Sequence, residues 1–131
     1  MKKAALILLS VLFSSSIFGQ TEKAETPKLK TYHLVILTKG ANRTQPQEEA
    51  MKIQEGHLAN ITRLHKEGKI DLAGPFDNSK ESDDNWRGVF VFNVQSKEEV
   101  EQLLQTDPAI SSGRLNYIIK PWMSESNNCL R

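Results

Sequence analysis

The stretch RGVFVFNVQSKEEVEQLLQ, residues 87–105, places a strand directly before a helix. Residues 87–94 are rich in valine and phenylalanine, the residue types that favour strands. Ser96 is followed three positions later by Glu99, which is the pattern of a capping box. We therefore predict a strand that ends near residue 94 and a helix that runs from Ser96 to about Gln105.

The predicted strand is apolar on both of its faces. Its side chains alternate, with Val89 and Val91 on one face and Phe90, Phe92 and Val94 on the other. An antiparallel sheet with one wet face should instead alternate apolar and polar residues. Helices can cover one face, so the other face needs a different cover. We expect a second copy of the same sheet to supply it, in a two-fold homodimer with the sheets face to face.

The remaining pattern completes an α+β unit around this strand. Five further elements are predicted: a strand at 31–38, a helix at 46–67, a strand at 69–76, a short turn or single helical turn at 106–113 and a strand at 114–122. The order is βαββαβ. With right-handed crossovers it gives a ferredoxin-like fold, in which a four-stranded antiparallel sheet carries two helices on one face.

Glycine and proline mark where these elements start and stop. Thr44, with a glutamine three positions later and Pro46 in the first turn, resembles the start of the first helix. Gly68 closes that helix, and the Gly74-Pro75 pair ends the second strand. We assign structural roles to these glycines and to Pro75.

The first 19 residues, MKKAALILLSVLFSSSIFG, have the pattern of a bacterial secretory signal peptide. The apolar run is too short to span a bilayer as a finished helix, and a transmembrane anchor is the alternative. We expect cleavage near Gly19-Gln20 and a periplasmic or secreted protein. The rest of the chain divides into a flexible leader at 20–30, one domain at 31–123 and a disordered tail at 124–131.

Composition excludes several classes of partner. Without Lys2 and Lys3 the basic residues fall from 17 to 15, against 16 acidic residues. This balance offers no electrostatic footprint for nucleic acid or for an anionic membrane surface. Cys129 is the single cysteine, so neither an internal disulfide nor a cysteine-bound metal centre is expected. We expect no cofactor, no metal, and no membrane association after signal cleavage.

The stretch QEGHLANITRLHKEGKI, residues 54–70, places a histidine within the apolar stripe of the first helix. At 100° per residue, His57 lies within about 20° of the mean direction of five apolar side chains. These are Ala50, Ile53, Leu58, Ile61 and Leu64. A core histidine bonded to a backbone carbonyl and an acid–base group both remain open. His65 lies roughly 12 Å further along the axis, too far to share a metal ion, and is expected to face solvent near the last carbonyls.

Asp107, in TDPAISSG, lies on a connection that can reach His57. Its local pattern is that of a helix N-cap, with Pro108 at the first helical position and Gly113 as terminator. A carboxylate partner for the histidine is the second interpretation. The two roles do not exclude each other.

Four segments together resemble the YCII-related proteins over about residues 31–122. They are YHLVIL (32–37), GHLANITRLHKEGKI (56–70), GPF (74–76) and SKEEVEQLLQTDPAISSGRLNYIIKPW (96–122). The resemblance implies a dimeric α/β barrel built from ferredoxin-like units. It also implies a pocket with a His–Asp pair, which falls on His57 and Asp107. The chain departs from the family pattern in an acidic loop at 77–85 and in its secretion signal.

A carboxylate that accepts from one imidazole nitrogen fixes the tautomer and leaves the other nitrogen to take a proton. We therefore predict acid–base proton transfer of isomerase or lyase type on a small organic molecule, with His57 catalytic and Asp107 as its orienter. The resemblance implies a substrate among aromatic-ring breakdown products. The alternatives are a non-catalytic small-ligand-binding protein and a dimeric scaffold of the periplasm.

Five other side chains are further candidates for the site or for the packing around it. Trp86 opens the third strand, and substrate binding and packing are equally favoured for it. Trp122 is expected in the core or at the dimer seam, and packing is favoured for His33. Ser111 and Ser112 lack the surrounding motif of an activated nucleophile.

Overall fold

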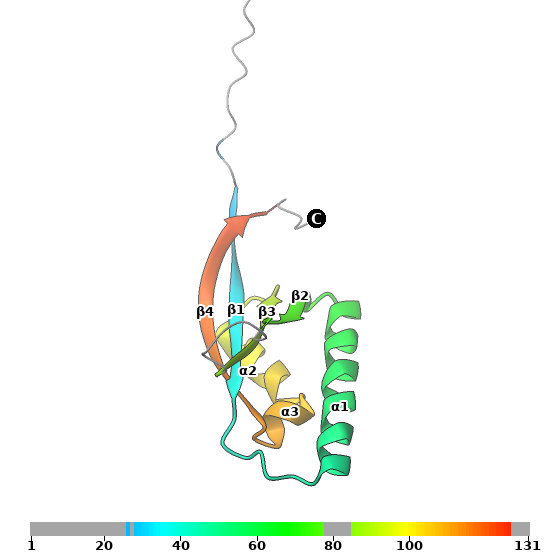
Figure 1. The fold of residues 1–131 in the computed structure, drawn as a ribbon. Helices are drawn as coiled ribbons and strands as arrows, with labels where there is room; N and C mark the ends of the chain where they lie inside the picture. The colour runs from blue at the N-terminus through cyan, green and yellow to red at the C-terminus, as the bar shows by residue number, and fades with distance from the viewer. Residues whose placement is uncertain (1–25, 27, 78–84, 127–131) are drawn as a thin grey trace, which may run out of the picture.

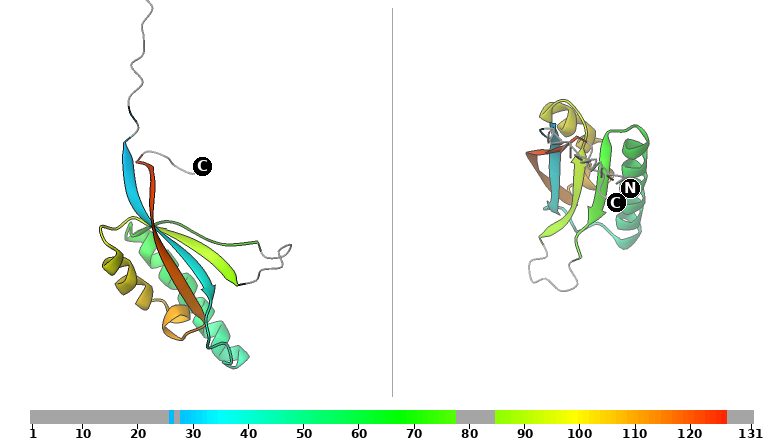
Figure 2. Two further views of the ribbon diagram at one scale, coloured as in Figure 1. Left: turned by 90° about the vertical axis from the view of Figure 1, so that its left-hand side faces the viewer. Right: turned by 90° about the horizontal axis from the view of Figure 1, so that it is seen from above.

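The computed structural model describes residues 26, 28–77 and 85–126. Within these ranges the elements are β1 (Leu29–Lys39), α1 (Gln47–Lys66), β2 (Ile70–Pro75), β3 (Trp86–Phe92), α2 (Lys97–Gln105), α3 (Pro108–Ser111) and β4 (Leu115–Glu125). The strands form an antiparallel sheet in the order β2-β3-β1-β4, and the helices cover one of its faces (Figure 1 and Figure 2). The predicted α+β, ferredoxin-like fold is confirmed.

Several predicted segments lie outside the described residues. They are the signal peptide at 1–19, most of the leader, residues 78–84 of the acidic loop, and the end of the tail with Cys129. Of the helices in the described part of the chain, none combines the length and the apolar character needed to cross a membrane.

The core lies between the helices and the covered face of the sheet. Its buried members are Val35, Leu37, Leu64, Ile70, Phe90, Phe92, Val94, Val100, Leu104 and Ile110. Every helix contributes at least one of these side chains, and so do β1, β2 and β3. Because all three helices share this one core, α1 and α3 are held against each other and not only against the sheet.

The predicted start of α1 is wrong in detail. Pro46 occupies the N-cap position and provides no side-chain hydrogen bond, while Oγ1 of Thr44 lies 3.4 Å from Oδ1 of Asn42. Thr44 stands outside the helix, because the helix begins only at Gln47. The capping box of α2 is confirmed, since Oγ of Ser96 accepts from the backbone N–H of Glu99 at 3.2 Å.

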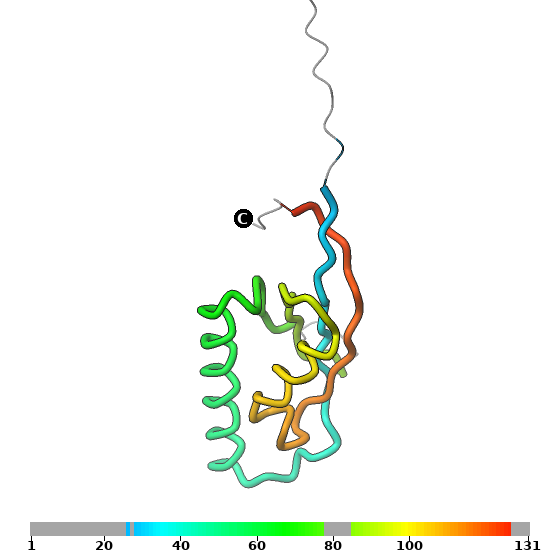
Figure 3. Tube along the Cα trace, turned by 180° about the vertical axis from the view of Figure 1, so that it is seen from behind, coloured from blue at the N-terminus to red at the C-terminus, as the bar shows by residue number. Residues whose placement is uncertain are grey.

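β1 and β4 are longer than predicted, at the start of β1 and at the end of β4. β1 and β4 pair in register from Leu29 opposite Glu125 to Lys39 opposite Leu115, so residues assigned to the leader and the tail belong to the sheet. Backbone hydrogen bonds extend the ladder, and they need no apolar side chains. Pro121 does not end β4, because β4 is an edge strand and tolerates a missing N–H. Figure 3 shows the long β1–β4 pair from behind.

Lys69 attaches the start of β2 to α2. Its Nζ lies 2.7 Å from Oε1 of Glu99, and this hydrogen bond lowers the pKa of the Glu99 carboxyl. A carboxyl whose folded-state pKa is lowered favours folding at neutral pH, and this contribution disappears as the pH falls through the lowered value.

Close backbone contact joins the connection after β1 to the turn before β4. The N–H of Gly40 donates to the carbonyl of Arg114 at 2.9 Å, and the N–H of Asn42 donates to that of Gly113 at 3.0 Å. A Cβ at Gly40 would overlap the carbonyl oxygen of Gly113 and lie 2.7 Å from the carbonyl carbon of Arg114. Only glycine fits here without moving backbone.

Replacing Gly40 by alanine should therefore lower the free energy of unfolding by more than about 2 kcal/mol, because backbone atoms must separate. Urea denaturation measures the change. Gly74→Ala is the matched control, since a Cβ there meets nothing within 4 Å, and it should stay within about 0.5 kcal/mol of the parent. Equal urea midpoints for the two variants would show that the contact at Gly40 is not tight.

Candidate active site

His57 and Asp107 are in contact although they lie far apart in the sequence. Nδ1 of His57, on α1, lies 2.7 Å from Oδ2 of Asp107, the residue before α3. Their side chains are 10% and 1% exposed. The second oxygen, Oδ1, accepts from the backbone N–H of Ala109 at 2.9 Å. Asp107 is thus both the N-cap of α3 and the partner of the imidazole, with one oxygen in each role.

A close approach of α3 to α1 brings this pair together. A Cβ at Gly56 would lie 2.8 Å from Cγ of Pro108, so the small residue beside His57 makes room for the first residue of α3. Asp107 precedes Pro108 and is carried to the imidazole by this contact. Gly113, with φ of 76°, then follows the C-cap of α3 and turns the chain towards β4.

Asn60 supports the connection from the other side, a role that the sequence pattern does not predict. It is buried, and its Oδ1 accepts from Nη2 of Arg63 at 2.7 Å and from Oγ1 of Thr106 at 3.0 Å. Thr106 directly precedes Asp107. His57 and Asn60, one turn apart on α1, therefore bind Asp107 and Thr106, the two residues that lead into α3. Asn60 lies three residues after His57, on the same face of α1, and this explains its burial. Because asparagine is polar, the apolar pattern of the sequence does not predict that it is buried.

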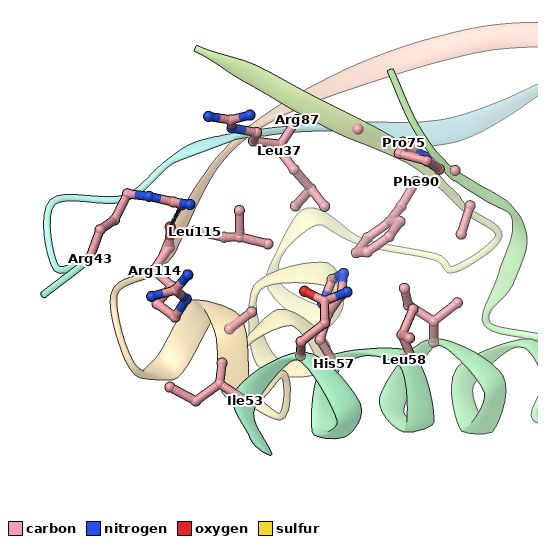
Figure 4. Close-up of a pocket in the computed structure, with 16 residues that line it drawn as sticks. Leu37, Arg43, Ile53, His57, Leu58, Pro75, Arg87, Phe90, Arg114 and Leu115 are labelled. Atoms are coloured by element: carbon pink, nitrogen blue, oxygen red, sulfur yellow. Dashed lines mark hydrogen bonds between the residues drawn. The ribbon is translucent and has the colours of Figure 1, made fainter. Parts of the chain in front are cut away.

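A pocket of about 400 Å³ opens beside the imidazole, between α1 and the covered face of the sheet. Because Nδ1 faces Asp107, Nε2 is the ring nitrogen left for a molecule in the pocket. The ring also stacks on Phe90, with centroids 6.1 Å apart and planes 29° apart. Figure 4 shows His57 rising from α1 towards the pocket, with Phe90 and Pro75 on one side.

The pocket walls are largely apolar, with basic side chains on one side. Apolar atoms come mainly from Leu37, Ile53, Leu58, Ile61, Phe90 and Leu115. Leu58 is 54% exposed, so it forms the rim of the pocket and does not belong to the core as predicted. Arg43, Arg87 and Arg114 also line the pocket. None of these arginines was singled out from the sequence, where nothing separates them from solvent-facing charges.

Trp86 does not line this pocket. It lies 47% exposed at the start of β3, with its ring 5.9 Å from that of Phe76. Neighbouring strand residues point to opposite faces, so Arg87 reaches the pocket and Trp86 does not. Gly74 and Pro75 end β2, as predicted, and they also form part of the pocket wall.

The remaining histidines and serines lie away from the pair. Nδ1 of His65 lies 3.0 Å from the carbonyl of Ile70, so it bonds to β2 and not to the last carbonyls of its own helix. His33 is buried in β1 on the core side. Ser111 and Ser112 are absent from the pocket lining. Across the described ranges, no cluster of three or more His, Cys, Asp or Glu side chains is placed to hold a metal ion.

Comparisons with known proteins agree on the family and the fold. A relative from Bacillus subtilis (strain 168), named Uncharacterized protein YjpA, is 31% identical to this chain over 67 residues. The matched residues cover 51% of this chain and 72% of that relative. A solved structure, 5-chloro-2-hydroxyhydroquinone dehydrochlorinase (TftG) from Burkholderia phenoliruptrix AC1100 in complex with 2,5-dihydroxybenzoquinone, has the same fold. It matches with a TM-score of 0.50 and 22% identity, over 69% of this chain and 92% of that one.

The family model of the YCII-related domain matches residues 32–123, which is most of the chain and nearly the whole of the predicted domain at 31–123. The match covers α1 to α3 completely and most of β1 and β4, and it includes His57 and Asp107. The chain belongs to the YCII-related domain family.

Proposed function

We propose that this protein is a small-molecule enzyme in which His57 is the catalytic acid–base and Asp107 is its positioning residue. One observation carries the proposal: a buried imidazole–carboxylate contact of 2.7 Å whose imidazole also lines a pocket. A purely structural histidine needs the hydrogen bond but has no need of a cavity. A volume of about 400 Å³ is in the range of small-molecule sites.

The reaction type follows from what an imidazole held in this way does. A carboxylate oxygen only accepts, so the hydrogen sits on Nδ1 and Nε2 carries a lone pair. Nε2 then takes a proton from a carbon next to a carbonyl, and the electron pair of the broken C–H bond forms a new double bond. In an isomerase the proton returns to another atom. In a lyase a neighbouring leaving group departs with its bonding pair.

The choice of first substrates comes from the solved relative. That protein is a dehydrochlorinase of a chlorinated hydroxyhydroquinone and holds a dihydroxybenzoquinone. We therefore propose oxygenated six-membered rings, and the enolisable products of their breakdown, as substrates of the YCII-like site in this chain. The predicted signal peptide favours action in the periplasm or outside the cell.

Proton NMR in D₂O tests the proposal directly. The protein is incubated with hydroxylated quinols, their chlorinated forms and enolisable lactones, and deuterium entry at carbon and chloride release are followed. We expect exchange or release well above the buffer rate with at least one compound class. Binding of these compounds without any exchange or conversion would contradict the enzyme proposal, and it would leave the alternative of a non-catalytic ligand-binding protein.

We also propose that the protein is a homodimer, paired through the sheet face that carries no helix. Ile36 on β1 stands between Val89 on β3 and Ile118 on β4, which forms an apolar row across this face. Ile118 is 43% exposed and Trp122 on the same face is 40% exposed. An apolar row of this kind is unusual on a surface that faces water.

Sedimentation equilibrium at micromolar concentration should therefore give the mass of two subunits. Ile118→Glu should give the mass of one folded subunit, because a charge at the seam is desolvated without a partner. Lys52→Glu, on the exposed side of α1, should leave the dimer intact. A single-subunit mass for the unaltered protein would refute the homodimer.

A further inference from the structure

We infer that the pocket is built for a small organic anion, whose anionic oxygens are held by Arg114 on the side opposite Phe90. The inference rests on the proposed function, because it names the substrate class of the same site. It is drawn from the presence of Arg114 in the pocket lining, the neutral partner that holds its guanidinium, and the position of the imidazole between Arg114 and Phe90.

The described lining of the pocket includes basic side chains but no acidic one. Among its residues in the described ranges are Arg43, Arg87 and Arg114, and none is an aspartate or a glutamate. Asp107 lies behind His57 with a side chain only 1% exposed, so it does not line the cavity. A guanidinium such as that of Arg114 in a concave, largely apolar site favours ligands of negative charge.

Arg114 is held in place by a neutral partner. Its Nη1 donates to Oε1 of Gln45 at 2.8 Å. An amide oxygen orients the guanidinium but does not neutralise its charge. A guanidinium is a planar fork of donors, and this geometry matches a carboxylate or a pair of neighbouring phenolic oxygens.

The backbone around Arg114 is held by the connection that also carries Arg43. Nη1 of Arg43 donates to the carbonyl of Arg114 at 2.9 Å, and Nδ2 of Asn42 donates to the carbonyl of Ser112 at 2.9 Å. Together with the close approach at Gly40, these bonds keep two arginines next to each other. The backbone that carries Arg114 is therefore fixed at several points beside the pocket.

The geometry also places an anion correctly for the chemistry. Figure 4 shows Arg43 and Arg114 on one side of the pocket, Phe90 and Pro75 on the other, and His57 between them. A flat ring with its anionic oxygen at Arg114 would pack against Phe90 and present a ring or side-chain carbon to Nε2 of His57. The same guanidinium would stabilise negative charge that develops when that carbon loses its proton.

Isothermal titration calorimetry with matched probes tests this inference. One pair compares 2,5-dihydroxybenzoate with its neutral amide and represents carboxylates. The other compares 2,5-dihydroxybenzoquinone, which is ionised at neutral pH, with its neutral dimethyl ether and represents phenolic anions. We expect the anion to bind at least about tenfold more tightly than its neutral partner in one pair or both, and the pair that responds identifies the source of the anionic oxygens.

Arg114→Gln should weaken anion binding about 10- to 100-fold and change binding of the neutral partner by less than about twofold. Arg114→Lys keeps the charge but loses the planar fork of donors. Its affinity for the anion should lie between that of the unaltered protein and that of Arg114→Gln. Lys52→Gln removes one positive charge outside the pocket and is the control, with unchanged binding expected. Circular dichroism shows whether each variant is folded. If Arg114→Gln does not fold, Arg114→Lys and the probe pairs still decide the question.

Equal affinities within both pairs, or equal losses for anion and neutral partner in Arg114→Gln, would overturn the inference. The proposed function is judged separately by turnover. Anion-selective binding without turnover supports this inference and contradicts the enzyme proposal. Turnover of neutral compounds that does not depend on Arg114 does the reverse.

Discussion

Replacing His57 by asparagine should lower the turnover number of the proposed reaction by about 10²- to 10⁴-fold, the usual contribution of a positioned acid–base group. The asparagine amide can donate to Asp107 from nearly the position of Nδ1, so the buried carboxylate keeps a partner. The substitution removes Nε2, the atom that takes the proton. Exchange of substrate carbon-bound hydrogen in D₂O measures the loss, and binding of the same substrate should change little.

His57→Ala is expected to behave differently in one respect. It leaves Oδ2 of Asp107 buried without the imidazole, which should cost about 1–3 kcal/mol of unfolding free energy in addition to the loss of turnover. His65→Asn is the matched control, because His65 bonds to the carbonyl of Ile70 and does not line the pocket. Turnover that persists in His57→Asn but falls in His65→Asn would contradict the assignment of the chemistry to His57 and would point to His65.

Most of the fold could be predicted because it depends on local patterns. Alternation in residues 87–94 and the capping box at Ser96 are read from adjacent residues, and both are confirmed. The ends of β1 and β4 could not be read in the same way, because they depend on which strand pairs with which. A polar residue such as Lys30 is a strand residue only because β4 lies beside it.

The candidate site was predictable in part for the same reason. The spacing on α1 placed His57 at the centre of the buried arc, and Asp107 was a candidate partner because its connection could reach the imidazole. The family resemblance added the expectation that the pair lies in a pocket. Arg114 was missed because its position depends on the turn at Gly113 and on the connection after β1, which are distant in the sequence. For Trp86, substrate binding and packing were both open from the sequence, and strand alternation separates it from Arg87, which lines the pocket.

Asp107→Asn should lower turnover nearly as much as loss of His57 while leaving the fold in place. The amide oxygen can still accept from the N–H of Ala109, so α3 keeps its cap. The amide nitrogen, however, donates towards Nδ1 of His57. The ring then carries its hydrogen on Nε2, and this atom no longer has a lone pair to take a proton. An amide at the corresponding position of a serine protease triad lowers turnover by about 10⁴-fold for the same reason.

The nitrogen shifts of the His57 ring, measured by ¹⁵N NMR, distinguish this effect from a merely structural one. In the unaltered protein the hydrogen should reside on Nδ1, and in Asp107→Asn on Nε2. Asp107→Ala loses the cap and the partner of a buried nitrogen together, and should lower the free energy of unfolding by more than about 2 kcal/mol.

Ser96→Ala provides the control for capping alone, because it removes the side-chain cap of α2. It should lower the free energy of unfolding by about 1 kcal/mol and leave turnover unchanged. An Asp107→Asn variant with the original tautomer and full turnover would mean that the carboxylate serves only α3. The contact with His57 would then be a consequence of how α1 and α3 pack. The position of the imidazole beside the cavity would need an explanation other than catalysis.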